Sequence, residues 1–313
     1  MGKLALVFPG QGSQTVGMGA ELSAAFAAAA SLYRRAAGAV GWDVADLSFR
    51  GPEERLSQTE FAQVALYVNS AAVAAVLAEQ GVSGDAVLGH SLGEYSALAA
   101  AGVISFEEGL ELVSRRGSAM AAAAARRPGS MAAVLGLADE EVERICGGSG
   151  AVWPVNYNCP GQLVISGEAG AVQQAMDKAR DAGARKVVKL PVSGAFHTPL
   201  MQSAAAEMEQ RLAGVKFKAA TPGFFSSISC RNEPADGMAG LLAGQIVSPV
   251  RWRQAVEALV AGGFDRFLEV GNGSVLCGLI RRIDKGVTAV NVSGPKSLDK
   301  AMKILSEGNL KNE

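Results

Sequence analysis

The sequence predicts an α/β protein in which a large domain with a mostly parallel sheet carries a small inserted subdomain. Short apolar runs alternate with helical patterns along most of the 313 residues, and such alternation favours a parallel sheet covered by helices on both faces. Between residues 128 and 191 the order becomes strand, helix, strand, strand, helix, strand, which is the ferredoxin-like (βαββαβ) signature. We therefore expect residues 1–127 and 192–313 to form the large domain, and residues 128–191 to form the inserted subdomain.

The elements of the large domain are predicted from apolar periodicity and from the turn residues that bound each run. Leu4–Phe8 stops at Pro9-Gly10, as a buried strand does, and Gly271-Asn272-Gly273 separates a strand from a helix. In chain order the predictions are strand 4–8, helices 17–37 and 60–80, strand 85–89, helices 93–101, 105–124 and 199–212, strand 224–229, helix 252–261, strand 265–270, helix 274–283, strand 287–292 and a closing helix from 297.

The elements of the inserted subdomain are shorter and are separated by clear turns. Pro160-Gly161 is a turn between two apolar runs, and Gly183 ends a helical pattern. The predictions are strands 130–135, 151–157, 162–166 and 185–190, with helices 139–146 and 168–182.

Composition narrows the class of protein. The formal net charge is −1, whereas a nucleic-acid or membrane-surface protein needs a basic excess, so neither partner is expected. No leader is expected from the N-terminus, whose apolar run is short, and no uncharged apolar stretch is expected to reach the ~18 residues of a membrane helix. The four cysteines are widely spaced and form no C-x-x-C pair, which favours small buried residues in a reducing compartment over disulfides or a metal site. We expect a cytoplasmic protein without metal.

The main chemical signal is Gly89-His90-Ser91-Leu92-Gly93, a G-x-S-x-G pentapeptide between a predicted strand and an alanine-rich helix. This pattern is typical of α/β-hydrolase-like folds, where it places a nucleophilic serine on a tight strand-to-helix turn. The helix N-terminus that follows would stabilise negative charge developing near Ser91. The large domain is therefore expected to be α/β-hydrolase-like, with Ser91 as its nucleophile.

A serine hydroxyl needs a base, and the chain contains only two histidines. His90 adjoins Ser91 on the strand, so its side chain is expected to point away from the face that Ser91 presents. That leaves His197 as the predicted base, in a loop that follows the inserted subdomain.

The first predicted strand ends in the glycine-rich turn Phe8-Pro9-Gly10-Gln11-Gly12-Ser13-Gln14. This turn lacks the Gly-Lys-Ser/Thr of a phosphate-binding loop, and Thr15 stands where a dinucleotide fingerprint has its third glycine. We interpret it as exposed backbone N–H groups, with the amides of Gln11 and Leu92 forming an oxyanion hole.

An α/β-hydrolase is the alternative chemistry. Such enzymes place an acid between serine and histidine, and their histidine is usually near the end of the chain. Here more than a third of the chain follows His197, and the region between Ser91 and His197 is mostly the predicted insert. The order of residues therefore fits a hydrolase poorly.

Six motifs are spread along nearly the whole chain. They are FPGQGSQ (8–14), GHSLGE (89–94), the Arg-Gly of LVSRRGSAM (112–120), NYNCPGQLVISG (156–167), GAFH (194–197) and QIVSPVRW (245–252). Together, and in this order, they resemble malonyl-CoA:acyl-carrier-protein transacylases and the related acyltransferase domains of polyketide synthases.

The resemblance implies a role for each matching position. Ser91 would accept the acyl group and His197 would be its base, oriented by the backbone carbonyl of Gln245. The amides of Gln11 and Leu92 would be the oxyanion donors. Substrate-binding residues would be Arg116, Phe196, Gln11, His90 and Asn158.

Two of these positions would determine which acyl group the protein accepts. Arg116 would hold the free carboxylate of malonyl, because a planar guanidinium grips a carboxylate with two parallel bonds. Arg115 precedes it, and neighbours on a helix point about 100° apart, so at most one should enter the cleft. Phe196 would favour malonyl over methylmalonyl, although polyketide members of the family carry His at the position of Gly194. Asn272 stands where the family commonly has Pro, and only a local effect on that loop is expected.

The resemblance also implies the substrates and partners. Malonyl-CoA would be the donor, and the acceptor would be the phosphopantetheine thiol of an acyl carrier protein, with no metal or redox cofactor. Because such carriers are acidic, the basic run 178–189 is a candidate docking surface through Arg180, Arg185 and Lys186. A monomer is expected. Three alternatives stay open: a hydrolase that clears acyl groups from carrier proteins, a stand-alone acyltransferase for a polyketide assembly line, and an inactive scaffold.

Overall fold

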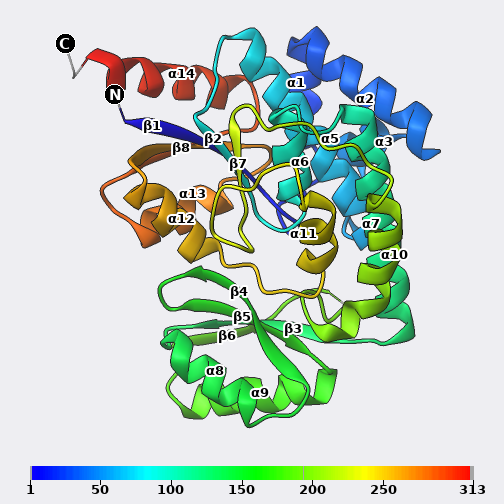
Figure 1. The fold of residues 1–313 in the computed structure, drawn as a ribbon, viewed down its shortest axis with the longest axis vertical. Helices are drawn as coiled ribbons and strands as arrows, with labels where there is room; N and C mark the ends of the chain where they lie inside the picture. The colour runs from blue at the N-terminus through cyan, green and yellow to red at the C-terminus, as the bar shows by residue number, and fades with distance from the viewer. Residues whose placement is uncertain (1, 193, 311–313) are drawn as a thin grey trace.

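The computed structural model describes residues 2–192 and 194–310 and has two parts (Figure 1). The larger part contains both termini and a five-stranded sheet, sheet A. All neighbouring strands of sheet A are parallel. Phe8, at the end of the first strand in the chain, lies opposite Gly89, at the end of the second. In spatial order the strands are β7 (Gly223–Phe225), β2 (Ala86–Gly89), β1 (Lys3–Phe8), β8 (Phe264–Val270) and β9 (Thr288–Val292).

Helices bury both faces of sheet A, as the apolar runs predict. On β1, Leu4, Leu6 and Phe8 enter one hydrophobic cluster, while Ala5 and Val7 enter another on the opposite face. The cluster on the first face also contains side chains of α1 (Ala20–Ala25), α2 (Ala27–Val40), α3 (Val44–Arg50), α4 (Glu53–Leu56), α5 (Thr59–Glu79), α6 (Gly93–Ala100), α7 (Phe106–Arg126), α10 (Gln202–Leu212), α11 (Met238–Gln245) and α14 (Pro295–Leu310). The second face is covered by α12 (Trp252–Ala261) and α13 (Val275–Ile283).

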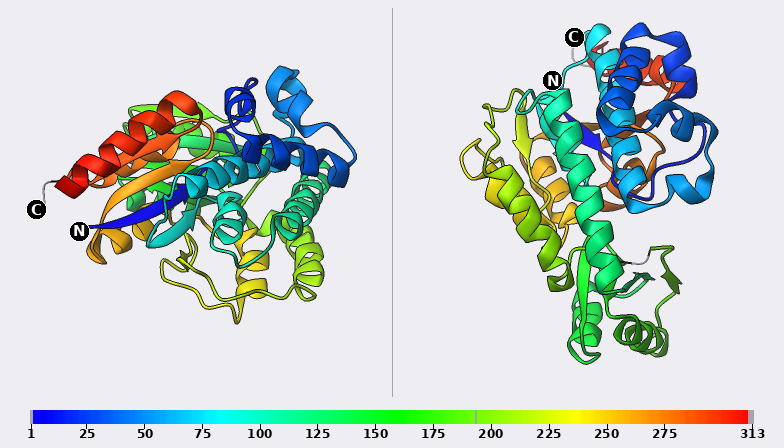
Figure 2. Two further views of the ribbon diagram at one scale, coloured as in Figure 1. Left: turned by 90° about the horizontal axis from the view of Figure 1, so that it is seen from above. Right: turned by 90° about the vertical axis from the view of Figure 1, so that its right-hand side faces the viewer.

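The smaller part is an antiparallel sheet, sheet B, with two helices on one face. Its spatial order β4-β5-β3-β6 places the first and third strands of the unit in the centre, which is the ferredoxin-like arrangement. Figure 2 (right) shows α7 running down from the larger part toward this unit. Its elements are β3 (Ser130–Leu135), α8 (Asp139–Gly147), β4 (Val152–Cys159), β5 (Gln162–Gly167), α9 (Ala169–Asp181) and β6 (Lys186–Lys189). The predicted fold class is confirmed.

Sheet B has two different faces. Ala132 and Val134 pack under α8 and α9 in a cluster of their own. Met131 and Ala133 alternate with them along β3, so they face the opposite way, and both line a cavity shared with the larger part. The insert therefore contributes one wall of that cavity.

A few elements differ from the sequence predictions. The single helix expected at 17–37 is two helices, because Phe26 has extended backbone angles. β7 ends at Phe225 rather than at residue 229, since the chain turns there and Ser226 accepts a hydrogen bond from the Cys230 amide. Helices α3, α4 and α11 were not predicted, and each is eight residues or shorter.

Helix α5 corrects the expectation that no stretch is long and apolar enough to cross a membrane. By length and composition alone it passes that test, but 72% of its apolar window is buried inside the fold. Its side chains belong to the main hydrophobic cluster. This is the pattern of a central core helix.

The turn after β2 depends on two glycines. Ser91 has a positive φ of 53°, which is uncommon for a residue with a side chain. A Cβ on Gly89 would lie 2.0 Å from the Glu94 nitrogen, and one on Gly93 would lie 2.1 Å from the Phe8 oxygen. Both contacts are to backbone, so the turn can form only if these positions have no side chain.

We predict that Gly93→Ala lowers the free energy of unfolding by about 1–3 kcal/mol, the usual range for overpacking. Gly38→Ala is the matched control, because Gly38 is exposed in α2 and an added methyl group there would have no atom within 4 Å apart from its own stretch of helix. That control should raise stability by about 0.5–1 kcal/mol. Urea unfolding of both variants measures the effect, and a Gly93→Ala protein as stable as the parent would contradict it.

Candidate active site

The candidate site is a cavity of about 370 Å³ at the carboxyl edge of sheet A, closed on its other side by sheet B. Gln11 follows β1 and Ser91 follows β2, so the parallel strands bring both residues to the same edge. Ligands of open parallel sheets usually bind at this edge, and the volume is in the range of small-molecule sites.

The structure brings Ser91 and His197 together. The Ser91 Oγ lies 2.8 Å from His197 Nε2. On the other side of the ring, Nδ1 lies 3.0 Å from the backbone oxygen of Gln245 and 3.1 Å from that of Ser248. Because carbonyl oxygens only accept hydrogen bonds, Nδ1 must carry the proton, and Nε2 is left to accept from the serine.

The environment keeps His197 neutral. Burial, and after it the nearby charge of Arg116, lowers the pKa of His197 from 6.5 to about 3. An imidazole with so low a pKa is unprotonated at neutral pH. His197 is therefore in the state that a general base requires.

Arg116 points into the interior from α7 and is 1% exposed, whereas Arg115 is exposed. Its guanidinium donates to Gln63 Oε1 (2.7 Å), Gln245 Oε1 (2.9 Å) and Ser91 Oγ (3.1 Å). Its Nε has no partner, and among the described residues no carboxylate forms an ion pair with it. A buried cation without an anion is costly, so this position is suited to an anionic ligand.

The two proposed oxyanion donors flank the serine. Leu92 directly precedes α6, so its amide belongs to the free N–H groups of a helix start. Across residues 2–192 and 194–310, neither this amide nor that of Gln11 donates a hydrogen bond to protein. Both are available to a ligand. Gln11 itself lines the cavity, and its side chain donates to Thr59 Oγ1.

His90 requires a correction. It lines the same cavity as Ser91 instead of pointing away from it, and its Nε2 lies 3.1 Å from Asn158 Oδ1. The positive φ of Ser91 ends the alternation of the strand, so the two neighbours no longer face opposite sides. Asn158 also lines the cavity, from β4.

Phe196 lies in the cavity wall and is 6% exposed. A Cβ on Gly194 would approach its ring to 2.4 Å. The glycine at 194 therefore makes room for the ring in its present position, and a histidine there would require the ring to move.

Sequence reasoning missed two buried polar residues, Gln63 and Glu94. Gln63 binds the Arg116 guanidinium from α5. It could have been noticed as an amide inside an otherwise apolar helix. Glu94 is 0% exposed and accepts from the side chain of Gln245, a residue for which the sequence predicts a role of the backbone carbonyl alone.

Asn272 also has a more definite place than a local loop effect. Its Nδ2 donates to the Ser13 oxygen (2.7 Å) and to Thr15 Oγ1 (2.9 Å). It thereby links the loop after β8 to the loop that carries Gln11.

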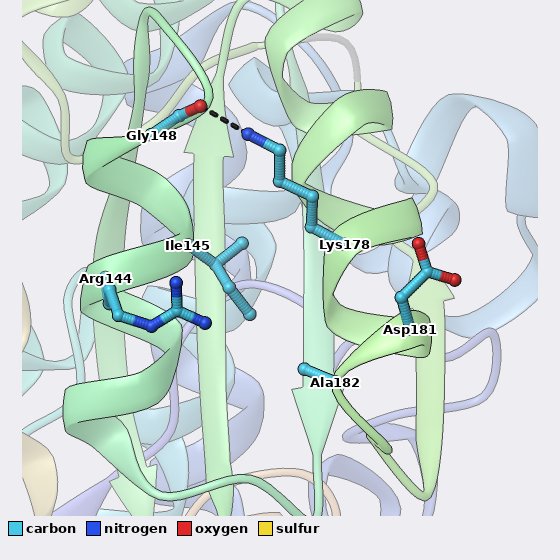
Figure 3. Close-up of a pocket in the computed structure, with 6 residues that line it drawn as sticks. All are labelled: Arg144, Ile145, Gly148, Lys178, Asp181 and Ala182. Carbon is cyan, nitrogen blue, oxygen red and sulfur yellow. Dashed lines mark hydrogen bonds between the residues drawn. The ribbon is translucent and has the colours of Figure 1, made fainter.

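A second cavity, of about 320 Å³, lies between α8 and α9 on the inserted unit (Figure 3). Lys178 donates to the Gly148 carbonyl across it, and Arg144 pairs with Glu141. Lys178 and Arg144 already have partners, and no serine, cysteine or histidine is among the residues that line this cavity. It is a hollow between two helices, on the face of sheet B away from Ser91.

The basic residues predicted for docking are exposed on the inserted unit. Arg180 lies on α9, over the face of sheet B that is turned away from the cavity, and pairs with Asp177. Lys186 begins β6, directly after Arg185. β6 leads on to Leu190, which lines the cavity.

Comparison with known proteins agrees with this geometry. Residues 5–295 match the family model of the acyl transferase domain. A malonyl CoA-acyl carrier protein transacylase of Bacillus subtilis is 38% identical, covering 99% of each chain. The crystal structure of an acyl-carrier-protein S-malonyltransferase from Bartonella henselae is 40% identical, with a TM-score of 0.94 over 98% of this chain and 100% of that one.

A further structural relative is the complex of a type II polyketide synthase acyl-carrier protein with its malonyl-transacylase. It is 38% identical, with a TM-score of 0.93 over 96% of this chain and 99% of that one. Because the family model matches residues 5–295 and the identity to these relatives extends over nearly the whole chain, the chain belongs to the acyl transferase family, in the group of malonyl CoA-acyl carrier protein transacylases.

Proposed function

We propose that this protein transfers a malonyl group from malonyl-CoA to the phosphopantetheine thiol of an acyl carrier protein, through an ester on Ser91. The observation that carries this proposal is the buried guanidinium of Arg116, which has no carboxylate partner among the described residues and lies 3.1 Å from the nucleophilic oxygen. An acyl group that ends in a carboxylate supplies the missing anion. A neutral acyl group does not.

The reaction has two half-steps. In the first, Ser91 Oγ attacks the thioester carbon while its proton moves to His197 Nε2. The amides of Gln11 and Leu92 stabilise the resulting oxyanion. The carbon–sulfur bond then breaks, coenzyme A leaves as the thiol with the proton from His197, and the malonyl ester remains on Ser91.

The second half-step reverses the first with a new thiol. His197 takes the proton of the phosphopantetheine thiol, whose sulfur attacks the ester carbon. The bond to Ser91 breaks, and the serine oxygen recovers the proton from His197. Each step uses groups of this chain and its two substrates, so the scheme requires no metal and no redox cofactor, and the phosphopantetheine arrives on the partner.

Phe196, His90 and Asn158 complete the substrate site in this proposal. The ring of Phe196 would lie beside the malonyl α-carbon and leave little room for a methyl branch, which favours malonyl over methylmalonyl. His90 and Asn158, which hydrogen-bond to each other in the cavity wall, offer polar groups to the substrate.

The malonylated carrier can serve fatty-acid or polyketide synthesis, because both consume the same product. A role in polyketide assembly is supported by the likeness to the polyketide malonyl-transacylase complex. A carrier-protein hydrolase is disfavoured, since it has no use for Arg116. An inactive scaffold is disfavoured by the short contact between Ser91 and His197.

We further propose a cytoplasmic monomer in which residues 128–191 form an inserted subdomain between residues 1–127 and 192–313 of the catalytic domain. An acidic carrier protein would dock through Arg180, Arg185 and Lys186. The exposure of these side chains, and the continuation of β6 into the cavity wall, support this surface.

The transfer proposal is tested by intact-mass analysis after mixing with malonyl-CoA. We expect a stable malonyl adduct that Ser91→Ala abolishes, because Ser91 is the nucleophile that contacts His197. Addition of a holo carrier protein should remove the adduct and malonylate the carrier. Rapid release of malonate without any carrier would instead indicate a hydrolase.

We predict that Arg116→Ala lowers the rate of malonyl loading by about 100-fold or more, because the lost contact joins two buried charges. Acetyl loading, which needs no guanidinium, should fall by less than about 10-fold. Arg115→Ala, an exposed neighbour on the same helix, is the control and should change neither rate. Equal losses for both acyl groups in Arg116→Ala would exclude the carboxylate-binding role.

Docking is tested by reversing the charges at Arg180, Arg185 and Lys186 together. We expect the KM for an acyl carrier protein to rise by about 10-fold, through lost electrostatic attraction, while loading from malonyl-CoA is unchanged. Steady-state transfer assays at low salt measure the first quantity, and intact mass measures the second. If both half-reactions weaken together, this surface is not the docking site.

A further inference from the structure

Glu94 is a completely buried carboxyl that the transfer mechanism does not use. It lies in the first turn of α6, three residues after the nucleophile, and is 0% exposed. Its Oε1 accepts from Ser226 Oγ (2.9 Å), the Ser227 amide (2.7 Å) and Ser227 Oγ (3.0 Å). Its Oε2 accepts from Gln245 Nε2 at 2.5 Å. Burial raises the pKa of Glu94, and these donors oppose the rise.

One amide connects this carboxyl to the substrate-binding arginine. Arg116 can only donate hydrogen bonds, so the Gln245 atom that lies 2.9 Å from it must be the amide oxygen. The amide nitrogen then faces Glu94 and also donates to the Ser91 backbone oxygen at 3.0 Å. The orientation of Gln245 is therefore fixed by its neighbours, and it separates a buried carboxyl from a buried guanidinium.

We propose that Glu94 is a positioning residue for recognition of the acyl carboxylate, and that it acts on Arg116 through the side chain of Gln245. The inference rests on the proposed function, because it assumes that Arg116 receives the carboxylate. Glu94 attracts the guanidinium across the amide and holds it in place. Since the two charges are not in contact, the guanidinium keeps donors for the substrate.

Gln245 also forms a hydrogen bond with the catalytic base, His197. The Gln245 backbone oxygen accepts from His197 Nδ1, and its side chain holds the Ser91 backbone. A loss of order at Gln245 would therefore affect both the arginine and the dyad. Malonyl selectivity is the readout that separates the role of Glu94 from general support of the site, because acetyl loading makes no carboxylate contact with Arg116 and so reports only the effect on Ser91 and His197.

An amide cannot replace Glu94. The Ser227 amide and the Gln245 amide nitrogen are both donors, and they face different oxygens of the carboxyl. A glutamine at 94 has one oxygen, so in either orientation its NH₂ opposes one of these donors. Flipping Gln245 in response would turn its own NH₂ toward Arg116, another donor.

A matched control exists at Glu269, which is also 0% exposed. Its two oxygens accept from the backbone amides of Leu276 and Cys277, so glutamine there meets the same conflict. Glu269 has no hydrogen bond to Arg116 or Gln245 among the described residues. Glu269→Gln therefore reproduces the general cost of the substitution without disturbing the arginine.

The test compares loading kinetics of Glu94→Gln and Glu269→Gln with malonyl-CoA and acetyl-CoA. For Glu94→Gln we expect the KM for malonyl-CoA to rise about 10-fold or more, while acetyl loading changes by less than about 3-fold. For Glu269→Gln we expect the ratio of malonyl to acetyl loading to stay at the parental value. An equal effect of Glu94→Gln on both acyl groups would overturn the inference.

Glu94→Asp keeps the test valid if Glu94→Gln folds poorly. It retains the negative charge but shortens the side chain by one methylene group, which withdraws the carboxyl from Gln245 Nε2. We expect the KM for malonyl-CoA to rise while acetyl loading changes by less than about 3-fold, and an equal effect on both acyl groups would overturn the inference. Arg116→Ala separates the two proposals: if it retains malonyl preference, the carboxylate-binding role itself fails, whatever Glu94 does.

Discussion

The site is organised around a buried positive charge that has no negative charge beside it in the described part of the chain. Arg116 is held by oxygens of Gln63 and Gln245 and by the Ser91 hydroxyl, all of them neutral groups. Neutral partners satisfy hydrogen bonds but add no negative charge, and the buried carboxyl of Glu94 is separated from the guanidinium by the Gln245 amide, so burial of this cation costs free energy. In the proposed function an anionic acyl group would recover part of this cost on binding, and acyl groups without a carboxylate would gain nothing comparable.

The same charge acts on the base. Arg116 is the second cause of the low pKa of His197, after burial. In the proposed function a carboxylate bound to the guanidinium would cancel much of its field at the imidazole, so the pKa of His197 would be higher with a malonyl group present than in the empty site. The imidazole would then be a stronger base when the correct substrate is in place. One side chain would thus couple selectivity to reactivity.

The parts of the site that were predictable from sequence are those with few competing assignments. Ser91 was marked by flanking glycines that the turn cannot do without, and His197 by the scarcity of histidine. The boundaries that failed depend on tertiary contacts: β7 ends early because Ser226 and Ser227 turn toward the buried Glu94. The placement of His90 was wrong because strand alternation does not continue through a residue with positive φ.

The role of Glu94 could not be predicted from the sequence, because it depends on hydrogen-bond partners that lie far away along the chain. In the sequence, Glu94 resembles an ordinary acidic residue in the first turn of a helix, where exposure to solvent is the usual outcome. Glu94 is a buried group because Ser226, Ser227 and Gln245, all far along the chain, pack against it and donate hydrogen bonds to it. The structure therefore identifies buried residues that support the motif residues and that the motifs themselves do not reveal.

The segment from 245 to 250 connects the inserted unit to the imidazole of His197. Val250 donates to the Val155 oxygen (2.7 Å) and accepts from the Tyr157 amide (2.9 Å), which attaches the stretch to β4. A few residues earlier, the backbone oxygens of Gln245 and Ser248 hold the imidazole of His197. The segment from 245 to 250 thus fixes the base on one side and the cavity wall on the other. A displacement of the insert relative to sheet A would strain the hydrogen bonds of His197. The same backbone segment therefore fixes the position of the cavity wall relative to the imidazole.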